Sequence, residues 1–350
     1  MAPRHRWALT AAVLVGVASL AHAQAVITNG TLRMGINRQG HLNFGNVPQI
    51  TGTNTVGLRL ITAAGDYEST ADGCTCEGWG VGIRSGSGVG TNWGGANDDD
   101  GITRLNVVSF TSTANSATSV VDVTGLSAGY GIRVTHEYRP SPTTPNLYEV
   151  RVSIQNTGTI NIPDLVYRRV MDWDISPSQF NENVRISGWP ASNLVGSGSN
   201  GFLGSQPLDV SGGCTIGGVC NGNFETTSGA DRGSFFDFSF GALAVGGTRS
   251  FTTFYGAAPT LDGLLAALGA VGAEVYTAAW CGPAGSGTTP TSCRGKNGPA
   301  VFGYGFQGVG GAPPPELPPP PGVIPEPSTY ALMLTGLAGL AALRRRRTAA

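Results

Sequence analysis

Two segments of this chain alternate apolar and polar side chains residue by residue, and this pattern limits the possible folds more than any other feature. They are residues 131–138 (GIRVTHEY) and 147–155 (LYEVRVSIQ), whose apolar faces consist of Ile132, Val134, Tyr148, Val150, Val152 and Ile154. A period of two with one apolar face indicates half-buried strands of an antiparallel sheet. The Pro-rich loop between the two segments predicts that they form a hairpin.

The rest of the chain between residues 24 and 311 has the composition of strands joined by many turns. Gly accounts for 54 of the 350 residues, about twice its usual share. Abundant Gly, Ser, Thr and Asn with little Glu and Lys disfavours helices. Further short strands are expected at residues 31–36, 107–110, 119–124, 235–240, 249–255 and 301–309. We expect 235–240 and 249–255 to pair as a second hairpin.

These patterns predict a mostly β fold: one antiparallel β-sandwich-like body of about a dozen strands over residues 24–311. Two smaller sandwiches, divided near residues 125–130 or 190–225, are the alternative. At least one peripheral helix is expected after Thr260, which can cap it. Its apolar face would consist of Leu261, Leu264, Leu265 and Leu268.

The first 23 residues have the three parts of a secretory signal peptide. A basic start at Arg4 and Arg6 precedes an apolar run at residues 7–20. Ala21 and Ala23 then supply a small-x-small cleavage site, which predicts a mature chain beginning at Gln24. An uncleaved membrane anchor is the alternative, although the run is shorter than the ~20 residues that span a bilayer.

The C-terminal end combines a linker with a second targeting segment. Residues 312–322 form a Pro-rich linker, and residues 323–350 form a tail. The tail contains the tripeptide Pro325, Glu326, Pro327, then an apolar helix at residues 331–343 and a basic cluster of Arg344, Arg345, Arg346 and Arg347. That helix would be about 20 Å long, shorter than the ~30 Å hydrocarbon core of a bilayer. A short transmembrane helix of this kind suits a temporary anchor.

This ordered tail resembles the PEP-CTERM sorting signal. The resemblance implies processing near residues 325–327 by an exosortase, a membrane-embedded protease-transpeptidase of Gram-negative bacteria that make exopolysaccharide. It also implies export through the inner membrane, transient anchoring by the C-terminal helix, and delivery to the cell surface or extracellular matrix. A simple C-terminal membrane anchor is the alternative.

The charge distribution argues against a nucleic-acid partner. The formal net charge is -1, and six of the 21 basic residues lie in the two terminal segments. The body between them shows no clustered Lys or Arg, which phosphate binding requires.

Six cysteines in an exported body argue for disulfides, because the compartment is oxidising. Their positions are Cys74, Cys76, Cys214, Cys220, Cys281 and Cys293. Proximity suggests the pairs 214–220 and 281–293, which leaves Cys74 with Cys76 across a single residue. Alternatively, Cys74 and Cys76 could form disulfides with the cysteines of one of the other two pairs. Metal binding by Cys74 and Cys76 is a further alternative.

Two acidic groups are the candidates for chemistry. Asp98 and Asp100, in a run of three aspartates, form a weak candidate site for Ca²⁺, with a solvated turn as the alternative. Asp172 and Asp174 share one face of a strand, with Glu182 nearby. Such carboxylates could serve as the acid and base of a glycoside-processing enzyme. The alternative is a network of ion pairs beside a half-buried Trp173.

Aromatic rings at Trp79, Trp93 and Trp173 would extend a sugar-binding surface around these acids. His136 is expected to be a core residue with its hydrogen bonds satisfied. No catalytic triad, metalloprotease or nucleotide-binding motif occurs, and no cofactor is expected apart from the Ca²⁺ candidate. We therefore expect a structural or adhesive surface protein without catalysis that contacts exopolysaccharide or other glycans. The alternatives are a secreted carbohydrate-active enzyme and a Ca²⁺-stabilised adhesion module.

Overall fold

The structure is a computed structural model that describes residues 24–45, 55–70, 73–86, 90–98, 100–176, 178–209, 220–282 and 293–312. The chain divides into two units, residues 1–315 and 316–350, and all described residues belong to the first. The predicted signal peptide, the sorting tail and all but the first residue of the linker lie outside the described residues.

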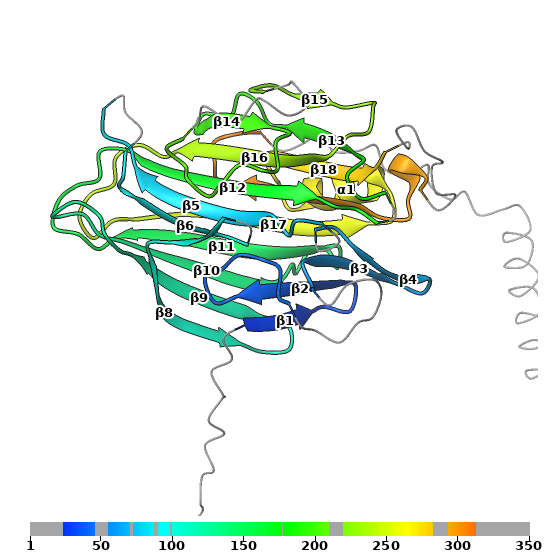
Figure 1. Cartoon of the computed structure of the whole chain (residues 1–350), viewed down its shortest axis with the longest axis horizontal. Helices are drawn as coiled ribbons and strands as arrows, with labels where there is room; N and C mark the ends of the chain where they lie inside the picture. The colour runs from blue at the N-terminus through cyan, green and yellow to red at the C-terminus, as the bar shows by residue number, and fades with distance from the viewer. Residues whose placement is uncertain are drawn as a thin grey trace, which may run out of the picture. The chain divides into compact units, whose positions relative to one another are not determined.

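The described residues form nineteen strands in three antiparallel sheets (Figure 1). The four-stranded sheet has the order β1 (Gln24–Thr28), β2 (Leu32–Asn37), β3 (Leu58–Thr62), β4 (Gly65–Glu68). The six-stranded sheet has the order β14 (Leu194–Gly198), β16 (Arg232–Ser239), β12 (Leu165–Trp173), β5 (Glu77–Ile83), β6 (Trp93–Asn97), β7 (Gly101–Thr103). The nine-stranded sheet has the order β15 (Phe224–Glu225), β13 (Glu182–Ser187), β18 (Val275–Cys281), β19 (Val301–Gln307), β17 (Thr248–Ala258), β11 (Leu147–Asn156), β10 (Ile132–Pro140), β9 (Ala117–Val123), β8 (Leu105–Ser112).

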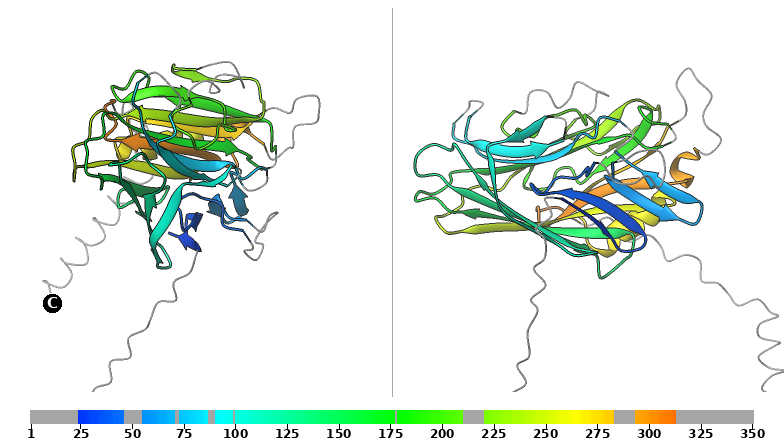
Figure 2. Two further views of the ribbon diagram at one scale, coloured as in Figure 1. Left: turned by 60° about the vertical axis from the view of Figure 1, so that its left-hand side comes forward. Right: turned by 60° about the horizontal axis from the view of Figure 1, so that its bottom comes forward.

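The six- and nine-stranded sheets lie face to face as two layers (Figure 2). Aromatic rings from both layers meet between them: the centroids of Phe238 and Phe306 are 4.8 Å apart, and those of Tyr167 and Phe251 are 5.0 Å apart. One continuous apolar core includes residues of all three sheets. The prediction of a mostly β, sandwich-like body is confirmed, with the four-stranded sheet as an addition that the sequence did not suggest.

The predicted hairpin is confirmed, since β10 and β11 pair from Ile132 opposite Asn156 to Pro140 opposite Tyr148. On either side of residues 125–130, one proposed division between two sandwiches, β9 and β10 pair directly in one sheet. The predicted number of strands was too low. Strands such as β5 and β12 are buried on both faces and lack the alternating pattern, and β7 and β15 are only three and two residues long.

The second predicted hairpin was wrong. Strand β16 pairs with β12 and β14, whereas β17 pairs with β11 and β19, so the connection between β16 and β17 crosses from one layer to the other. The connection from β11 to β12 crosses beside it, and the two are bridged between Ile162 and Leu243. A short Gly-rich connection is compatible with either geometry, and burial of both aromatic strands in the core favoured the crossing.

The predicted peripheral helix is present as α1 (Leu261–Ala270). The Thr260 side chain accepts a hydrogen bond from the Gly263 amide at 3.2 Å, as expected of an N-cap. Its leucines pack with residues of β17, β18 and β19, such as Phe254 and Trp280, on the face of the nine-stranded sheet away from the main core.

The loop that follows β2 joins the small sheet to the two large ones. The backbone carbonyl of Gln39 accepts a hydrogen bond from Trp79 Nε1 at 2.9 Å, and that of Gly40 accepts one from the Tyr138 hydroxyl at 2.8 Å. Trp79 belongs to the six-stranded sheet and Tyr138 to the nine-stranded sheet. The loop therefore fills space between the two layers.

Candidate functional site

Three acidic residues singled out in the sequence come together where β12 ends. Asp172 lies in β12, Asp174 just beyond it, and Glu182 begins β13. One carboxylate oxygen from each of Asp172, Asp174 and Asp231 lies within 4.8 Å of the other two. Glu182 lies near them: its Oε1 accepts a hydrogen bond from the amide of Ile175, the residue after Asp174, at 3.2 Å, and the charges of Asp174 and Asp172 act on its carboxylate. We call Asp172, Asp174, Glu182 and Asp231 the carboxylate cluster.

Alternation along β12 determines which side chains reach this cluster. Tyr167, Met171 and Trp173 face the main core, whereas Val170 belongs to a separate apolar group with Leu203 and Phe235. Asp172 continues the second face, as the sequence predicted for Asp172 and Asp174 together. The segment with Gly201 covers this face: a Cβ on Gly201 would lie 2.4 Å from Asp172 Oδ1. The glycine is needed there because any side chain would displace the carboxylate.

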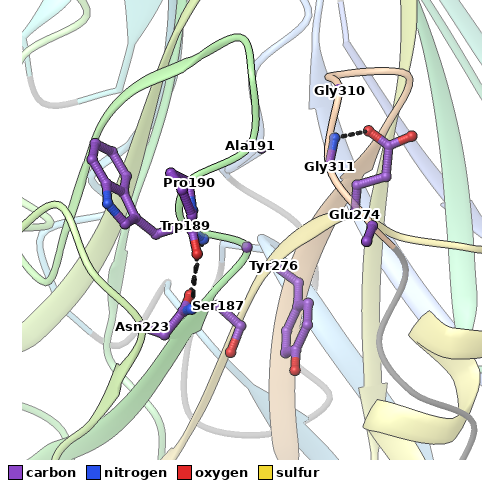
Figure 3. A pocket seen from close by; sticks show the side chains of 11 residues that line it. Ser187, Trp189, Pro190, Ala191, Asn223, Glu274, Tyr276, Gly310 and Gly311 are labelled. Atoms are coloured by element: carbon purple, nitrogen blue, oxygen red, sulfur yellow. Dashed lines mark hydrogen bonds between the residues drawn. The ribbon is translucent and has the colours of Figure 1, made fainter.

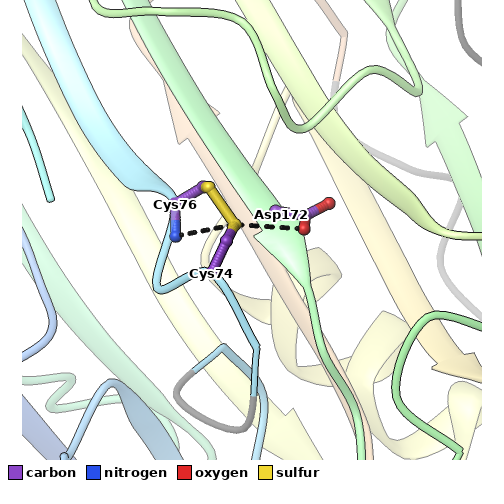
Figure 4. A group of neighbouring side chains, drawn as sticks. All are labelled: Cys74, Cys76 and Asp172. Atoms are coloured by element: carbon purple, nitrogen blue, oxygen red, sulfur yellow. Dashed lines mark hydrogen bonds between the residues drawn. A yellow bond between two sulfur atoms is a disulfide. The ribbon is translucent and has the colours of Figure 1, made fainter. Parts of the chain in front are cut away.

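The cluster is nearly closed to solvent. Asp172 is 1% exposed, and Asp174 and Glu182 are 0% exposed. The Cys74–Cys76 disulfide lies against it, with Cys74 Sγ 3.4 Å from Asp172 Oδ2 (Figure 4). A disulfide sulfur carries no proton, so this contact supplies no hydrogen bond to the carboxylate. Asp172 Oδ1 and Glu182 Oε2 have no hydrogen-bond partner either.

Burial and mutual repulsion hold these acids toward their neutral forms. Burial, then the neighbouring Asp174 and Asp231, raises the pKa of Asp172 to about 8. Burial, then Asp174, raises the pKa of Glu182 to about 10. Burial also raises the pKa of Asp231. A positive charge is therefore needed nearby before Asp172, Glu182 and Asp231 can ionise together.

The other fully buried acids differ from the carboxylate cluster in having arginine partners. Among the described residues, Glu68, Glu77 and Asp237 are the remaining fully buried carboxylates, and each has an arginine. The shortest N–O distances are 2.6 Å for Arg59–Glu68, 2.5 Å for Arg169–Glu77 and 2.7 Å for Arg168–Asp237. With the described residues, by contrast, Asp172, Glu182 and Asp231 form no ion pair.

Asp231 is the member of the cluster that the sequence did not identify. It precedes β16, and the register that sets Gly233 opposite Asp172 brings it to the same end of β12. This pairing joins residues 61 positions apart, 172 and 233. The available signal was an acidic residue four positions before the aromatic run at 235–240, and it became informative only once β16 was known to neighbour β12.

Asp98 and Asp100, the Ca²⁺ candidate from the sequence, contact different segments. Asp98 Oδ2 accepts a hydrogen bond from the Thr75 hydroxyl at 2.6 Å, and Asp100 Oδ2 accepts one from the Ser205 amide at 2.9 Å. They flank the turn between β6 and β7. In this position the two carboxylates tie neighbouring loops to the sheet.

The structure pairs Cys281 with Cys293 as well as Cys74 with Cys76. Both cysteines of the Cys74-Thr75-Cys76 segment are therefore oxidised and are not thiolate ligands for a metal. Cys220 is disulfide-bonded too. Its suggested partner, Cys214, lies outside the described residues.

Two expectations about aromatic and histidine residues need correction. Trp79 and Trp173 are 0% exposed, because they sit on the inward faces of β5 and β12, so neither ring can stack on a sugar. His136 is buried as predicted, yet its hydrogen bonds are only partly satisfied. Its Nε2 lies 3.5 Å from the Tyr167 hydroxyl, and its Nδ1 has no partner.

A separate surface pocket of about 600 Å³ lies beside β13 and β18 (Figure 3). Its lining includes Ser187, Trp189, Pro190, Asn223, Glu274 and Tyr276. Asn223 holds the Trp189 backbone from both sides, accepting from its amide and donating to its carbonyl, each at 2.9 Å. The hollow combines two aromatic residues with polar groups.

Comparison with protein families decides what the C-terminal tail is. A family model described as the PEP-CTERM protein-sorting motif matches residues 323–347. This chain carries a PEP-CTERM sorting motif. The matched range contains Pro325, Glu326 and Pro327, the apolar segment 331–343 and the cluster Arg344–Arg347, so the resemblance proposed from the sequence is confirmed.

The PEP-CTERM motif indicates an exported protein that is processed by an exosortase and sorted to the cell surface or extracellular space. No curated protein matches the chain. Within the described residues, no helix has the length and apolar character to cross a bilayer. The expected membrane helix of the PEP-CTERM tail, 331–343, lies outside them.

Proposed function

We propose that this PEP-CTERM protein is a structural or adhesive component of the cell surface or exopolysaccharide matrix and that its body has no catalytic activity. The observation that supports this most is the burial of the predicted acid–base pair. Asp172, Asp174 and Glu182 are at most 1% exposed, and a glycosidic bond must reach both carboxylates to be cleaved.

The pocket next to Trp189 is where this protein would contact a glycan. Saccharides are bound by aromatic rings together with amide, hydroxyl and carboxylate groups, and Tyr276, Asn223 and Ser187 provide this mixture around a hollow of about 600 Å³. The Glu274 carboxylate is already occupied, since it accepts hydrogen bonds from the amides of Gly308, Val309 and Gly311 at 2.8–3.0 Å. It therefore shapes the pocket rather than offering a charged ligand group.

The first test is C-terminal peptide mapping of the protein recovered from the native cell surface and from the medium. A C-terminus near residues 325–328, together with retention in the matrix fraction, is expected. An intact tail reaching Ala350 would contradict processing. A body found only as free protein in the medium would contradict the structural role.

Glycan binding and turnover are tested on the same material with a panel of exopolysaccharides. We expect Trp189→Ala to weaken retention on the bound glycan about tenfold, whereas Trp93→Ala, outside the pocket lining, leaves it unchanged. If the native protein hydrolyses a glycan and both Asp172→Asn and Asp174→Asn abolish that hydrolysis, the body is an enzyme.

A further inference from the structure

Among the described residues, Asp172, Glu182 and Asp231 have no arginine or lysine partner, whereas each fully buried carboxylate outside the carboxylate cluster has one. The arginines at Glu68, Glu77 and Asp237 show that this fold accommodates buried carboxylates by pairing them. Four acids together at the end of β12, without such a partner for Asp172, Glu182 or Asp231, would repel one another strongly if ionised.

We propose that the carboxylate cluster binds one hard divalent cation, Ca²⁺ in the exported protein. Clustered carboxylate oxygens are the ligands that Ca²⁺ prefers. One ion would supply a positive charge beside Asp172, Glu182 and Asp231, which form no ion pair.

The spacing of the oxygens fits this ion. Ca²⁺ binds oxygen at 2.3–2.6 Å, so ligands on opposite sides of it are about 5 Å apart. The three aspartate oxygens lie within 4.8 Å of one another, which allows a single ion to contact all of them. Mg²⁺ would require the same oxygens to approach to about 4 Å or less, in near-ideal octahedral geometry.

Glu182 provides an observation independent of the three aspartates. Its side chain is fully buried, and only Oε1 is fixed, by the Ile175 amide. Oε2 has no hydrogen-bond partner, and Asp174 and Asp172 are the charged groups that act on this carboxylate. A buried acceptor without a partner, under the influence of two other acids, is costly unless a cation or a proton stabilises it.

The neighbouring covalent structure would hold the ligands in position. The Cys74–Cys76 disulfide packs on Asp172, and a Cβ on Gly73 would lie within 2.2 Å of the Asp174 carboxylate oxygens. Such close contacts restrict the positions of the two carboxylates. Asp231, which is partly exposed, is the member through which an ion would enter.

The test uses the exported protein, stripped with a chelator and titrated with Ca²⁺ by calorimetry. We expect one ion per chain, with Kd on the order of 0.1–1 mM as in other extracellular modules. Saturating Ca²⁺ is expected to raise Tm by at least about 5 °C over the chelated protein. No binding, or the same Tm in chelator and in Ca²⁺, would overturn the proposal.

Two substitutions locate the site. Asp231→Asn and Glu182→Gln are each expected to weaken Ca²⁺ binding by at least about tenfold. In chelator, both variants should unfold at the same temperature as the native protein or higher, because a neutral amide replaces an acid whose pKa burial raises. Asp98→Asn, at the other acidic loop, should retain the native response to Ca²⁺.

A native Ca²⁺ response in both cluster variants, or its loss only in Asp98→Asn, would place the ion elsewhere and refute this assignment. Because these measurements involve neither glycan nor matrix, their failure would leave the proposed surface role untouched. Failure of matrix retention would likewise leave the cation site standing.

Discussion

Arg169 and Glu77 form an ion pair inside the core, with 2.5 Å between Nη2 and Oε1 and side-chain exposures of 1% and 0%. Both lie in the six-stranded sheet. Glu77 also accepts a hydrogen bond from the Tyr255 hydroxyl of the nine-stranded sheet at 2.9 Å, and one from the Leu42 amide, in the loop after β2, at 2.6 Å. One carboxylate thus connects all three sheets.

Removing both partners of this pair should cost less stability than the two single removals added together. Glu77→Gln leaves the buried Arg169 charge unpaired, and we expect it to lower the free energy of unfolding by about 3–5 kcal/mol. The double variant Glu77→Gln, Arg169→Met should lose less than the sum of the single changes. Urea unfolding of the four proteins forms the double-mutant cycle.

The exposed pair Arg133–Asp122 provides the control for that cycle, because solvent screens it. Arg133→Met should change stability by at most about 1 kcal/mol. Strict additivity of the two core substitutions would show that Arg169 and Glu77 do not depend on each other.

His41 should make the protein sensitive to acid. Burial, and then the charge of Arg169, lowers the pKa of His41 to about 3, so it stays neutral while the unfolded chain binds a proton below pH 6.5. Stability therefore rises with pH between about 3 and 6.5, and this contribution is lost as the pH falls. Asp98, 3.9 Å from Nε2, makes no ion pair with a neutral imidazole.

The measurement is the difference in unfolding free energy between the native protein and His41→Gln as the pH is lowered. The buried acids contribute with the opposite sign, and the difference cancels those that do not interact with His41. The pKa of His136 is lowered partly by His41, so His136 adds to the measured difference. We expect the difference to change by about 1.4 kcal/mol per pH unit between pH 6 and pH 4. A difference that is constant over this range would show that His41 is protonated in the folded protein.

The Cys281–Cys293 disulfide closes a loop with a sequence separation of 12. Such a loop restricts the unfolded chain, so Cys281→Ser with Cys293→Ser should cost about 2–3 kcal/mol. Unfolding is compared with that of the oxidised native protein, and non-reducing peptide mapping checks the bond. Equal stabilities would show that the loop is not constrained by this link.

Thr260 is expected to stabilise α1 through its hydroxyl. Thr260→Ala should lower the free energy of unfolding by about 1 kcal/mol, because the Gly263 amide loses its acceptor. Thr260→Ser keeps the oxygen and is the matched control, with little change expected in thermal unfolding. Similar losses in both variants would assign the effect to the threonine methyl group.

Sequence patterns identified the parts of this protein whose neighbours in the chain are also neighbours in space. The hairpin at 132–156, the helix after Thr260 and the disulfide between Cys281 and Cys293 all belong to this class. Each depends on a local period, a cap or a short separation. These signals can be recognised in a sequence without knowledge of the fold.

What the sequence did not show depends on pairing across long separations. Asp231 reaches Asp172 only because β16 lies beside β12, and Trp79 and Trp173 are hidden because both faces of their strands are covered. The insertion of Gln39 and Gly40 between the layers leaves no periodic trace, because it rests on backbone carbonyls. Polar residues in buried strands were therefore interpreted as a surface.

The anchorage of the last strand also determines how the body responds to mechanical load. Strand β19 lies between β18 and β17 in the interior of the nine-stranded sheet, and Glu274 binds the amides of Gly308, Val309 and Gly311 where the chain leaves it. A pull on Ala312 along the strand would have to shear two ladders of hydrogen bonds at once, rather than peel an edge strand one bond at a time. A pull on the C-terminal end of the body would thus act on an interior strand rather than on an edge strand.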